Sequence, residues 1–350
     1  MRIEAQCQRT RGRGGAGMGL RVGVVGCGGA GSEHARAYRG LTGRVELVGV
    51  CDVQRERAAR LADAVGTRAY AALDDLLATE RPDVVSVCTA EYAHTEPVLA
   101  ALAAGCHVLC EKPLAATVDD ARRMVRAAGV AGKVLGVDYN YRHMPAFRGL
   151  REELARGTLG EPVLAQVSAH AFCYHHALDL VRFLFGPVAE VGAWIDDVPS
   201  RRDFPWHTPE EFLYVPSVSV TAVFRTRAGA TVTLGASRLR ALEDTLLDVE
   251  VVGSRARRAL RGLPVQDTRP RVVEAWPPDA GASARMGAWV EGHPAFSLSD
   301  AFGASVAAFV DALQAGQAVP TDGHDGLAVL LLDQAVVQAH RLGGWVRLGA

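Results

Sequence analysis

A lysine and a glycine-rich segment are the parts of this chain whose residue types and spacing most clearly predict chemistry. The sequence contains 38 lysines and arginines, and only two of them, Lys112 and Lys133, are lysines. Lys112 stands in Cys-Glu-Lys-Pro at 110–113, and an ammonium, unlike a guanidinium, can change its pKa and carry a proton. Upstream, residues 26–31 read Gly-Cys-Gly-Gly-Ala-Gly, which fits the pattern G-x-G-x-x-G. Together these features predict an oxidoreductase with a proton-handling lysine near a dinucleotide, although Lys112 alone could be a surface lysine at a strand end.

The glycine-rich segment follows an apolar run at 20–25 and precedes a helical pattern, and this setting gives its glycines a mechanism. Gly26 permits the tight turn, Gly28 lets the backbone approach a pyrophosphate, and Gly31 lets the helix pack closely on the strand. The amides at the start of the helix then face the anion. The cofactor-binding residues expected in this segment are Gly26, Gly28, Gly29, Ala30 and Gly31.

An acidic residue, Asp52, follows the next apolar run and completes the pattern of a dinucleotide site. Asp52 is placed to accept hydrogen bonds from the ribose hydroxyls of the adenosine, and it would repel a 2′-phosphate. The sequence therefore favours NAD over NADP. The nearby Arg55 and Arg57 keep NADP open as the alternative, and the other role open to Asp52 is to cap the helix that follows.

The first half of the chain alternates short apolar runs with helical patterns, which is typical of a parallel sheet covered on both faces. The pattern predicts a doubly wound α/β Rossmann domain over 20–139, preceded by a disordered leader over 1–19 that is rich in arginine and glycine. The expected strands are 20–25, 45–51, 84–89, 107–110 and 133–137, and the expected helices are 32–38, 55–65, 73–78, 96–104 and 117–128.

From about residue 140 the pattern changes to that of an α+β domain over 140–350. Its expected strands are 161–171, 217–225, 231–237 and 246–252, and its expected helices are 147–156, 177–185, 301–313 and 326–341. These elements predict a substrate-binding and oligomerisation domain with an open, mainly antiparallel sheet. Because the open face of such a sheet needs cover, a homo-oligomer, either a dimer or a tetramer, is expected.

The composition narrows the classes of function. The formal net charge of −1 gives no reason to expect nucleic acid or a membrane surface as partner, and no apolar run reaches the roughly 20 residues that span a bilayer. The seven cysteines are scattered and show no C-x-x-C spacing. They predict buried thiols in a reducing, cytoplasmic compartment, without a disulfide framework or a metal site.

Several further motifs carry a resemblance to a known family. In chain order they are Cys-Thr-Ala-Glu-Tyr-Ala-His at 88–94, Glu-Lys-Pro at 111–113, Tyr-Arg-His-Met-Pro at 141–145, Leu-Gly-Glu-Pro at 159–162 and His-Ala-Leu-Asp at 176–179. With these motifs and the glycine-rich segment, the chain resembles the glucose–fructose oxidoreductase and inositol dehydrogenase family, called Gfo/Idh/MocA, from residue 20 to 348.

The resemblance implies an NAD(P)-dependent dehydrogenase or reductase that transfers a hydride between nicotinamide and a carbinol or ketone of a sugar, nucleotide sugar or cyclitol. The family lysine that matches Lys112 lies near the nicotinamide and the reacting carbon, and the lysine–proline bond that follows it is often cis. The family histidine that matches His176 commonly acts as general acid or base. The residues expected beside the cofactor in these motifs are Thr89, His94, Glu111, Lys112 and Pro113.

The chain departs from the family pattern just before His176. The family normally has an aspartate four residues earlier, after a long loop, but here that position is Phe172 and the loop is nearly absent. Three interpretations follow: an active enzyme that uses Lys112 and His176, an enzyme for a larger substrate enclosed by 199–216, or a sensor or scaffold that has lost the chemistry. An NAD-dependent glycosidase or an imine reductase on the same frame is a further alternative.

Other residues near these motifs are candidates for contact with a substrate. Tyr141 and Arg142 follow the last Rossmann strand, where ligand clefts of open α/β sheets lie, and Arg142 could instead brace the junction of the domains. The adjacent His175 and His176 point in different directions at a helix start, so at most one is expected to reach a cleft. The candidate substrate residues are Tyr141, Arg142, Tyr174, His175 and Asp179.

Overall fold

The computed structural model describes residues 19–196, 219–237, 247–261, 271–275, 289–290 and 298–349. The chain forms two compact units: Met1–Tyr139 with Phe302–Leu330, and Asn140–Ala301 with Leu331–Ala350. The sequence assigned everything after residue 139 to the second domain, whereas Phe302–Leu330 belongs to the first unit. The expected leader, apart from Gly19, lies outside the described residues, as does the segment 199–216.

The first unit is built on a parallel sheet with the strand order β3-β2-β1-β4-β5-β6. Its strands are β1 (Leu20–Val25), β2 (Val45–Cys51), β3 (Arg68–Tyr70), β4 (Val84–Val87), β5 (His107–Glu111) and β6 (Leu135–Asp138). This order is that of a doubly wound dinucleotide-binding sheet, so the predicted Rossmann domain is confirmed. The short β3 was not predicted, because its residues are polar or partly exposed and show no apolar run.

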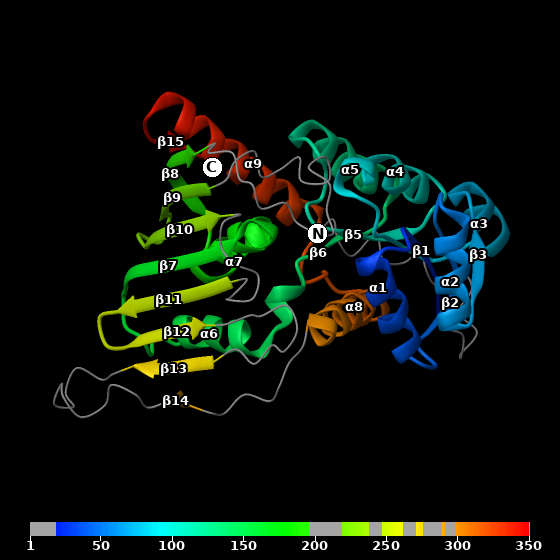
Figure 1. Cartoon of the computed structure of the whole chain (residues 1–350), viewed down its shortest axis with the longest axis horizontal. Helices are drawn as coiled ribbons and strands as arrows, with labels where there is room; N and C mark the ends of the chain where they lie inside the picture. Colours follow the sequence, from blue (N-terminus) through cyan, green and yellow to red (C-terminus); the bar gives the residue numbers. More distant parts are fainter. Residues whose placement is uncertain are drawn as a thin grey trace. The chain divides into compact units, whose positions relative to one another are not determined.

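Helices cover both faces of this sheet, as Figure 1 shows. They are α1 (Gly29–Gly40), α2 (Arg55–Val65), α3 (Leu73–Glu80), α4 (Thr95–Ala103), α5 (Val118–Ala131) and α8 (Leu298–Ala315). Apolar side chains of α1, α2 and α8 form one core with those of β1, β2, β4 and β5. The predicted N-cap of α5 is confirmed, since the hydroxyl of Thr117 accepts the backbone N–H of Asp120 at 3.0 Å.

The segment Phe302–Leu330 joins the first unit because it packs on the edge strand β6. The ring of Phe309 lies only 2.6 Å from where a Cβ on Gly136 would be, so the glycine makes room for α8. Next to it, the hydroxyl of Ser305 donates to the carboxylate of Asp138. The backbone N–H of Val137 donates to the carbonyl of Thr321 at 3.1 Å. No local sequence pattern indicates that the chain returns to the first unit at Phe302–Leu330. For this reason the sequence assigned the segment to the second domain.

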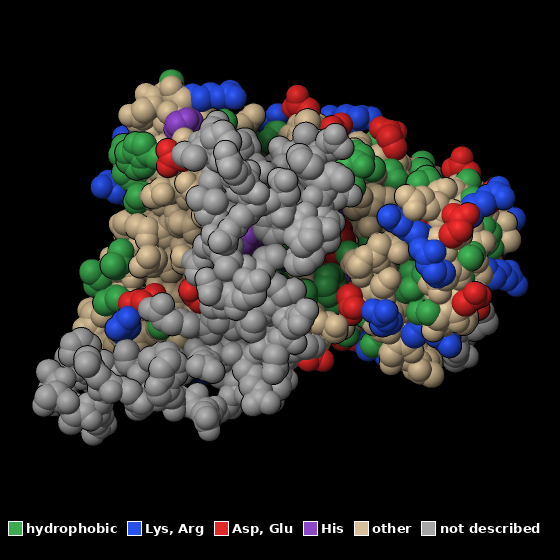
Figure 2. All heavy atoms as spheres, viewed as in Figure 1, with side chains coloured by type: hydrophobic (Ala, Val, Ile, Leu, Met, Phe, Trp, Pro, Cys, Tyr) green, Lys and Arg blue, Asp and Glu red, His purple; other side chains and the backbone are tan. Residues whose placement is uncertain are grey.

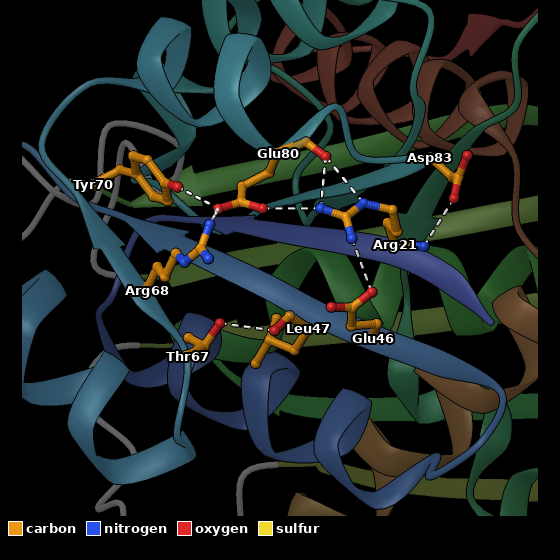
Figure 3. A network of polar contacts seen from close by, with 8 residues as sticks. All are labelled: Arg21, Glu46, Leu47, Thr67, Arg68, Tyr70, Glu80 and Asp83. Carbon is orange, nitrogen blue, oxygen red and sulfur yellow. Dashed lines mark hydrogen bonds and ion pairs between the residues drawn. The ribbon is translucent and has the colours of Figure 1, made fainter. Parts of the chain in front are cut away.

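The buried carboxylate of Glu80 binds side chains of strands β1 and β3 in the first unit (Figure 3). Arg21 of β1 donates to the carboxylate of Glu80 at 2.9 Å, and Arg68 and Tyr70 of β3 donate to its other oxygen at 2.7 and 2.5 Å. Arg21 also reaches Glu46 of β2 at 2.9 Å. Burial raises the pKa of Glu80, but the contacts to Tyr70, Arg68 and Arg21 outweigh burial and hold the pKa below its usual value.

The second unit is built on a mixed sheet with the order β14-β13-β12-β11-β7-β10-β9-β8-β15. Of its described pairings only β7 with β10 is parallel, which confirms the predicted open, mainly antiparallel sheet. The strands are β7 (Pro162–His170), β8 (Val188–Asp196), β9 (Ser219–Thr226), β10 (Thr231–Ser237), β11 (Leu247–Gly253), β12 (Arg257–Arg261), β13 (Arg271–Ala275), β14 (Trp289–Val290) and β15 (Val346–Arg347).

Two helices of this unit, α6 (Pro145–Ala155) and α7 (Tyr174–Phe185), precede and follow β7, and α7 packs on that strand. Along β7 the side chains of Ala165, Val167 and Ala169 are buried, while those of Leu164 and Gln166 are exposed. This alternation shows that one face of the strand packs into the unit and the other faces outward. The last helix, α9 (Gly323–Leu342), begins in the first unit and ends in the second.

None of the helices in the described parts of the chain is long and apolar enough to cross a membrane. On the described surface of the first unit, acidic and basic side chains are interspersed in the view of Figure 2. That face therefore presents charges of both signs rather than a field of one sign.

Candidate active site

The glycine-rich segment forms the turn between β1 and α1. The reason why a glycine is present differs from one position of the turn to the next. Gly26 has φ +90°, and a Cβ there would meet the carbonyl oxygen of Cys88 at 2.4 Å. A Cβ on Gly31 would meet the carbonyl oxygen of Gly26 at 1.8 Å, so the helix approaches the turn too closely for a side chain. At Gly28 and Gly29, by contrast, a Cβ would meet none of the described residues within 4 Å. The described residues thus leave room beside the backbone at the start of α1, which fits an approaching pyrophosphate.

Asp52 connects the end of β2 to this turn. One carboxylate oxygen accepts the backbone N–H of Cys27 at 2.8 Å, and the other accepts that of Gln54 at 2.8 Å. The N-cap residue of α2 is Gln54, so Asp52 supports the helix start without being its cap. Each carboxylate oxygen has a second lone pair, and the arrangement is therefore compatible with the expected contact to ribose hydroxyls.

The Lys112 turn follows the end of β5. The peptide bond between Lys112 and Pro113 is cis, as the resemblance led us to expect. The carboxylate of Glu111 accepts the backbone N–H of Lys112 at 3.1 Å. On the other side, the carbonyl oxygen of Pro113 lies 2.9 Å from a ring nitrogen of His94. The backbone of the partly buried Lys112 is thereby fixed from both neighbours.

His94 links the Lys112 turn to the loop after β4. Its second ring nitrogen lies 3.0 Å from the carbonyl oxygen of Thr89, and the Thr89 hydroxyl donates to the carbonyl of Ala93 at 3.1 Å. Burial lowers the pKa of His94, and its hydrogen bonds and Glu111 offset this only in part. A neutral imidazole has one N–H, so it donates to one of the two carbonyls at a time. Contact of Thr89 and His94 with the cofactor stays a prediction.

His176, the expected acid or base, lies in the first turn of α7 and is 4% exposed. Its ring stacks on the ring of Tyr141, with the centroids 3.9 Å apart and the planes 8° from parallel. The hydroxyl of Tyr141 contacts the thiol of Cys173 at 3.3 Å, and burial raises the pKa of this tyrosine well above its usual value. Tyr141, expected as a substrate contact, is therefore buried and supports the imidazole.

Arg142 and Asp179 form a two-point ion pair near His176. The Nε of Arg142 donates to one oxygen of Asp179 at 2.8 Å, and a terminal nitrogen donates to the other at 2.5 Å. Asp179 is 1% exposed and the Arg142 side chain 10%. The guanidinium also lies over the ring of Phe183, 5.3 Å from its centroid. The pair braces the start of the second unit against α7, within that unit, and the two roles expected for Arg142, substrate contact or bracing of the domain junction, stay predictions.

A carboxylate from α9, Asp333, approaches the other residues at the start of α7. Its oxygen lies 3.7 Å from a ring nitrogen of His175. Burial and a hydrogen bond with Asp333 raise the pKa of Tyr174 well above its usual value. His175 therefore faces Asp333 while His176 faces Tyr141, which confirms that the adjacent histidines point in different directions. Sequence reasoning missed Asp333, and its place within the apolar pattern of α9 gave no signal for it.

The strand order, the glycine turn and the acidic residue after β2 define the first unit as a dinucleotide-binding domain of the NAD-dependent oxidoreductase class. Residues 20–139 match the sequence model of the family described as "Oxidoreductase family, NAD-binding Rossmann fold". Residues 20–139 thus match this family, Gfo/Idh/MocA, which is described as NAD-binding. The family recognised from the motifs is thus confirmed.

Characterised relatives extend the match beyond the first unit. The chain is 28% identical to inositol 2-dehydrogenase 3 of Saccharopolyspora erythraea over 93% of its own length and 94% of the relative's. It is 39% identical to D-glucoside 3-dehydrogenase of Escherichia coli over 157 residues, which is 44% of either protein. The chain thus spans less than half of that second relative.

Solved structures show the same fold over nearly the whole chain. The WlbA dehydrogenase of Bordetella pertussis, in complex with NADH and UDP-GlcNAcA, gives a TM-score of 0.76 at 23% identity, over 95% of this chain and 99% of its own. A levoglucosan dehydrogenase in complex with NADH and levoglucosan gives 0.78 at 20% identity, over 95% and 100%. At this level of identity the likeness establishes the fold alone.

Proposed function

We propose that this chain is an NAD-dependent oxidoreductase that transfers a hydride between nicotinamide and a carbinol or ketone of a sugar, nucleotide sugar or cyclitol. The observation that carries the proposal is the Lys112 turn at the end of β5, in the same parallel sheet as the glycine turn after β1. Ligands of open α/β sheets bind at the carboxyl ends of the strands, so both features stand at the functional edge. Relatives named inositol 2-dehydrogenase and D-glucoside 3-dehydrogenase support the substrate class.

Two side chains would handle charge and protons in this reaction. When bound, the nicotinamide supplies or accepts the hydride. The ammonium of Lys112 would stabilise the negative charge that develops on the substrate oxygen. The imidazole of His176 would accept the hydroxyl proton during oxidation and return it during reduction, and a positioned base of this kind accelerates a reaction by roughly 100- to 10,000-fold.

The other candidates of the second unit divide into two groups. Tyr141, Arg142 and Asp179 contact His176 or the helix that carries it, and we propose that they position it. Tyr174 and His175 share the same helix start, and we propose them as contacts of the sugar-like substrate. Asp333 of α9 lies beside both residues and would hold their orientation.

The choice of NAD over NADP rests on Asp52. Its carboxylate lies at the end of β2, where it would accept ribose hydroxyls and repel a 2′-phosphate. Arg55 and Arg57 are exposed in the first turn of α2 and are the groups that could favour NADP instead. Titrating the protein with NADH and then with NADPH, followed by energy transfer from its tryptophans, tests this choice. Tighter binding of NADPH would contradict the role given to Asp52.

The test of the activity is a screen of cyclitols, sugars and nucleotide sugars, in which NADH formation or consumption is measured. Turnover with one of them would support the proposal. Binding of NADH without turnover on any of them would favour a second candidate, a sensor or scaffold that keeps the cofactor. Phe172 and the short connection after β7 are the observations in favour of that candidate. A glycosidase would instead release a sugar with no net change in NADH. Analysis of the reaction products would identify a glycosidase or an imine reductase.

We further propose that the chain works as a homo-oligomer in the cytoplasm. The outward face of the second sheet carries the uncharged Gln166, Thr221 and Gly235 and the 61% exposed Trp194, together with charged residues such as the ion-paired Glu190 and Arg225. A second copy would cover such a face. The six described cysteines are buried thiols without disulfides, which suits a reducing compartment. Light scattering at several concentrations tests the assembly, and a monomer throughout would contradict it.

A further inference from the structure

A buried histidine and two carboxylates lie together in the first unit, and two of the three were not expected from the sequence. His34 comes from α1, Glu111 ends β5 and Asp138 ends β6. Glu111 and Asp138 are direct partners in the parallel pairing of the two strands. The exposed fractions are 0% for His34, 6% for Glu111 and 0% for Asp138. Among the described residues, these form the one group of histidine, cysteine and acidic side chains close enough to share a metal ion.

The contacts within this group are direct hydrogen bonds. The Nε2 of His34 lies 2.9 Å from an oxygen of Asp138 and 3.1 Å from an oxygen of Glu111. The Nδ1 of His34 lies 3.1 Å from the hydroxyl of Ser86. The second oxygen of Asp138 accepts from Ser305, and that of Glu111 accepts the backbone N–H of Lys112. Every polar atom of the three side chains thus has a protein partner, and the structure needs no metal to satisfy them.

Charge explains why a histidine stands between the two acids. Two neighbouring carboxylates lose their hydration when buried and repel each other unless a cation lies between them. Burial lowers the pKa of His34, but the neighbouring Cys88 and the hydrogen bonds with Asp138 and Glu111 raise it well above its usual value. The Nε2 of His34 lies between the two carboxylates, so this setting favours the protonated ring, whose charge compensates theirs.

The hydrogen bonds of His34, Glu111 and Asp138 connect three parts of the first unit: the helix after the glycine turn, the Lys112 turn and α8. The helix that carries His34 begins at the glycine turn. Glu111 directly precedes Lys112 and accepts its backbone N–H at 3.1 Å. Asp138 accepts from Ser305 of α8, and Phe302 of the same helix meets the edge of the His34 ring at 5.6 Å between centroids.

We propose that His34 is a positioning residue for Lys112: it fixes the carboxylate of Glu111, and through it the backbone of the lysine, relative to the helix that begins at the glycine turn. The inference rests on the proposed function for the catalytic value of Lys112, but the positioning itself does not depend on turnover. Replacing His34 leaves two buried carboxylates without the imidazole that lies between them and hydrogen-bonds to both. The Glu111 side chain would then move toward another cation or toward water, and the Lys112 turn would move with it.

The two lysines of the chain provide a test that needs no activity. The full chain is treated with a limiting amount of acetic anhydride, and mass spectrometry gives the ratio of acetylated Lys112 to acetylated Lys133. We expect this ratio to change several-fold in His34→Gln and in the nearly isosteric Glu111→Gln. Glu80→Gln is the matched control, because it removes a buried, ion-paired carboxylate at the strand starts of the same sheet. Its ratio should stay at the wild-type value.

Kinetics separate positioning from general damage. In His34→Gln we expect kcat to fall on the order of 100-fold, the cost of a displacement of about 1 Å in a catalytic group. The Kd for NADH should stay within a few-fold, because the glycine turn keeps its own contacts. Replacing Glu111 by Gln in addition should recover part of the lost kcat, since it removes one uncompensated charge. A purely structural defect would lower NADH binding and kcat together and would show no recovery.

The outcomes distinguish the two proposals. If the wild-type chain binds NADH but shows no turnover, the proposed function fails, and the acetylation ratio still decides the role of His34. If His34→Gln does not fold, Glu111→Gln decides it. An unchanged ratio in folded variants would overturn the inference. A stoichiometric amount of a metal in the purified wild-type protein, found by elemental analysis, would overturn it as well, because His34 would then be a ligand.

Discussion

In the first unit the candidate lysine is held by hydrogen bonds, whereas in the second unit the candidate histidine is held by ring stacking. Glu111 binds the N–H of Lys112, and the carbonyl of Pro113 contacts His94, so the backbone of the lysine is fixed on both sides. The plane of the His176 ring is set by the ring of Tyr141. Hydrogen bonds define a backbone path, and stacking defines the orientation of a ring.

The difference shows where each arrangement originates in the chain. The Lys112 turn is positioned largely by residues at the ends of parallel strands, which the fold brings to one edge. The start of α7 is positioned by Asp333 from the last helix and by Arg142, which comes well before it in the chain. The second arrangement therefore depends more on tertiary packing of the second unit, and substitutions should separate the two.

The largest expected effect concerns His176. We expect His176→Ala to lower kcat by roughly 100- to 10,000-fold, the usual worth of a positioned acid or base. Tyr141→Phe keeps the stacked ring and removes only the contact with Cys173, so it should retain most of the activity. Steady-state kinetics on the substrate found in the screen checks both. Full activity of His176→Ala would show that His176 is not the acid or base of the reaction.

The glycine turn offers the next effect, again with a paired control. Gly28→Ala adds a methyl group that contacts no described residue at the start of α1, so we expect it to weaken NADH binding while the stability of the fold is kept. Gly31→Ala adds it 1.8 Å from the carbonyl oxygen of Gly26, so we expect loss of both binding and stability. NADH titration and thermal unfolding separate these results. Wild-type NADH affinity in Gly28→Ala would show that the pyrophosphate does not approach there.

The ion pair of Arg142 and Asp179 is expected to contribute to stability. Removing one partner of a buried pair leaves an uncompensated charge and costs about 3–5 kcal/mol of the free energy of unfolding. We expect Asp179→Asn to approach this loss, measured by urea unfolding. The control is Glu33→Gln, which breaks an exposed pair with Arg36 worth about 0.2–1 kcal/mol. Equal losses of unfolding free energy in the two variants would show that the buried pair of Arg142 and Asp179 stabilises the protein no more than an exposed pair does.

The smallest effect concerns pH and Glu80 in the first unit. Its contacts hold its pKa below the usual value, so their stabilisation is present above the pKa of an unfolded glutamate, about 4.3, and is lost as pH falls through the lower folded value. Removing hydrogen bonds to a charged group costs about 1.5–3 kcal/mol. We expect Glu80→Gln to lose stability at pH 7 and to approach the wild type in acid. A difference that is independent of pH would contradict the lowered pKa.

The sequence predicted well those parts that local patterns determine. The turn from Gly26 to Gly31 and the acidic residue after β2 belong to short motifs whose geometry is set by neighbouring residues, whereas the cis bond after Lys112 was expected only from the family resemblance. The alternation of apolar strands and helices sufficed for the Rossmann order because connections between parallel strands follow few rules.

The remaining features depend on contacts between distant parts of the chain. Ser305 binds Asp138 across 167 positions, and Asp333 approaches His175 from the last helix. No spacing in the sequence relates these residues. A weaker signal existed for His34: with Gly31, Ala35 and Tyr38 it lies on one buried face of α1, where a polar residue needs a partner.

The measurement that tests the account most directly compares Lys112→Ala with Lys133→Ala. Both variants remove a lysine from the first unit, and each is titrated with NADH before turnover is measured on the substrate found in the screen. The account predicts that both bind NADH with about wild-type affinity, that Lys133→Ala keeps its turnover, and that Lys112→Ala loses nearly all of it. Undiminished turnover in Lys112→Ala would contradict the central claim that this lysine serves the reaction.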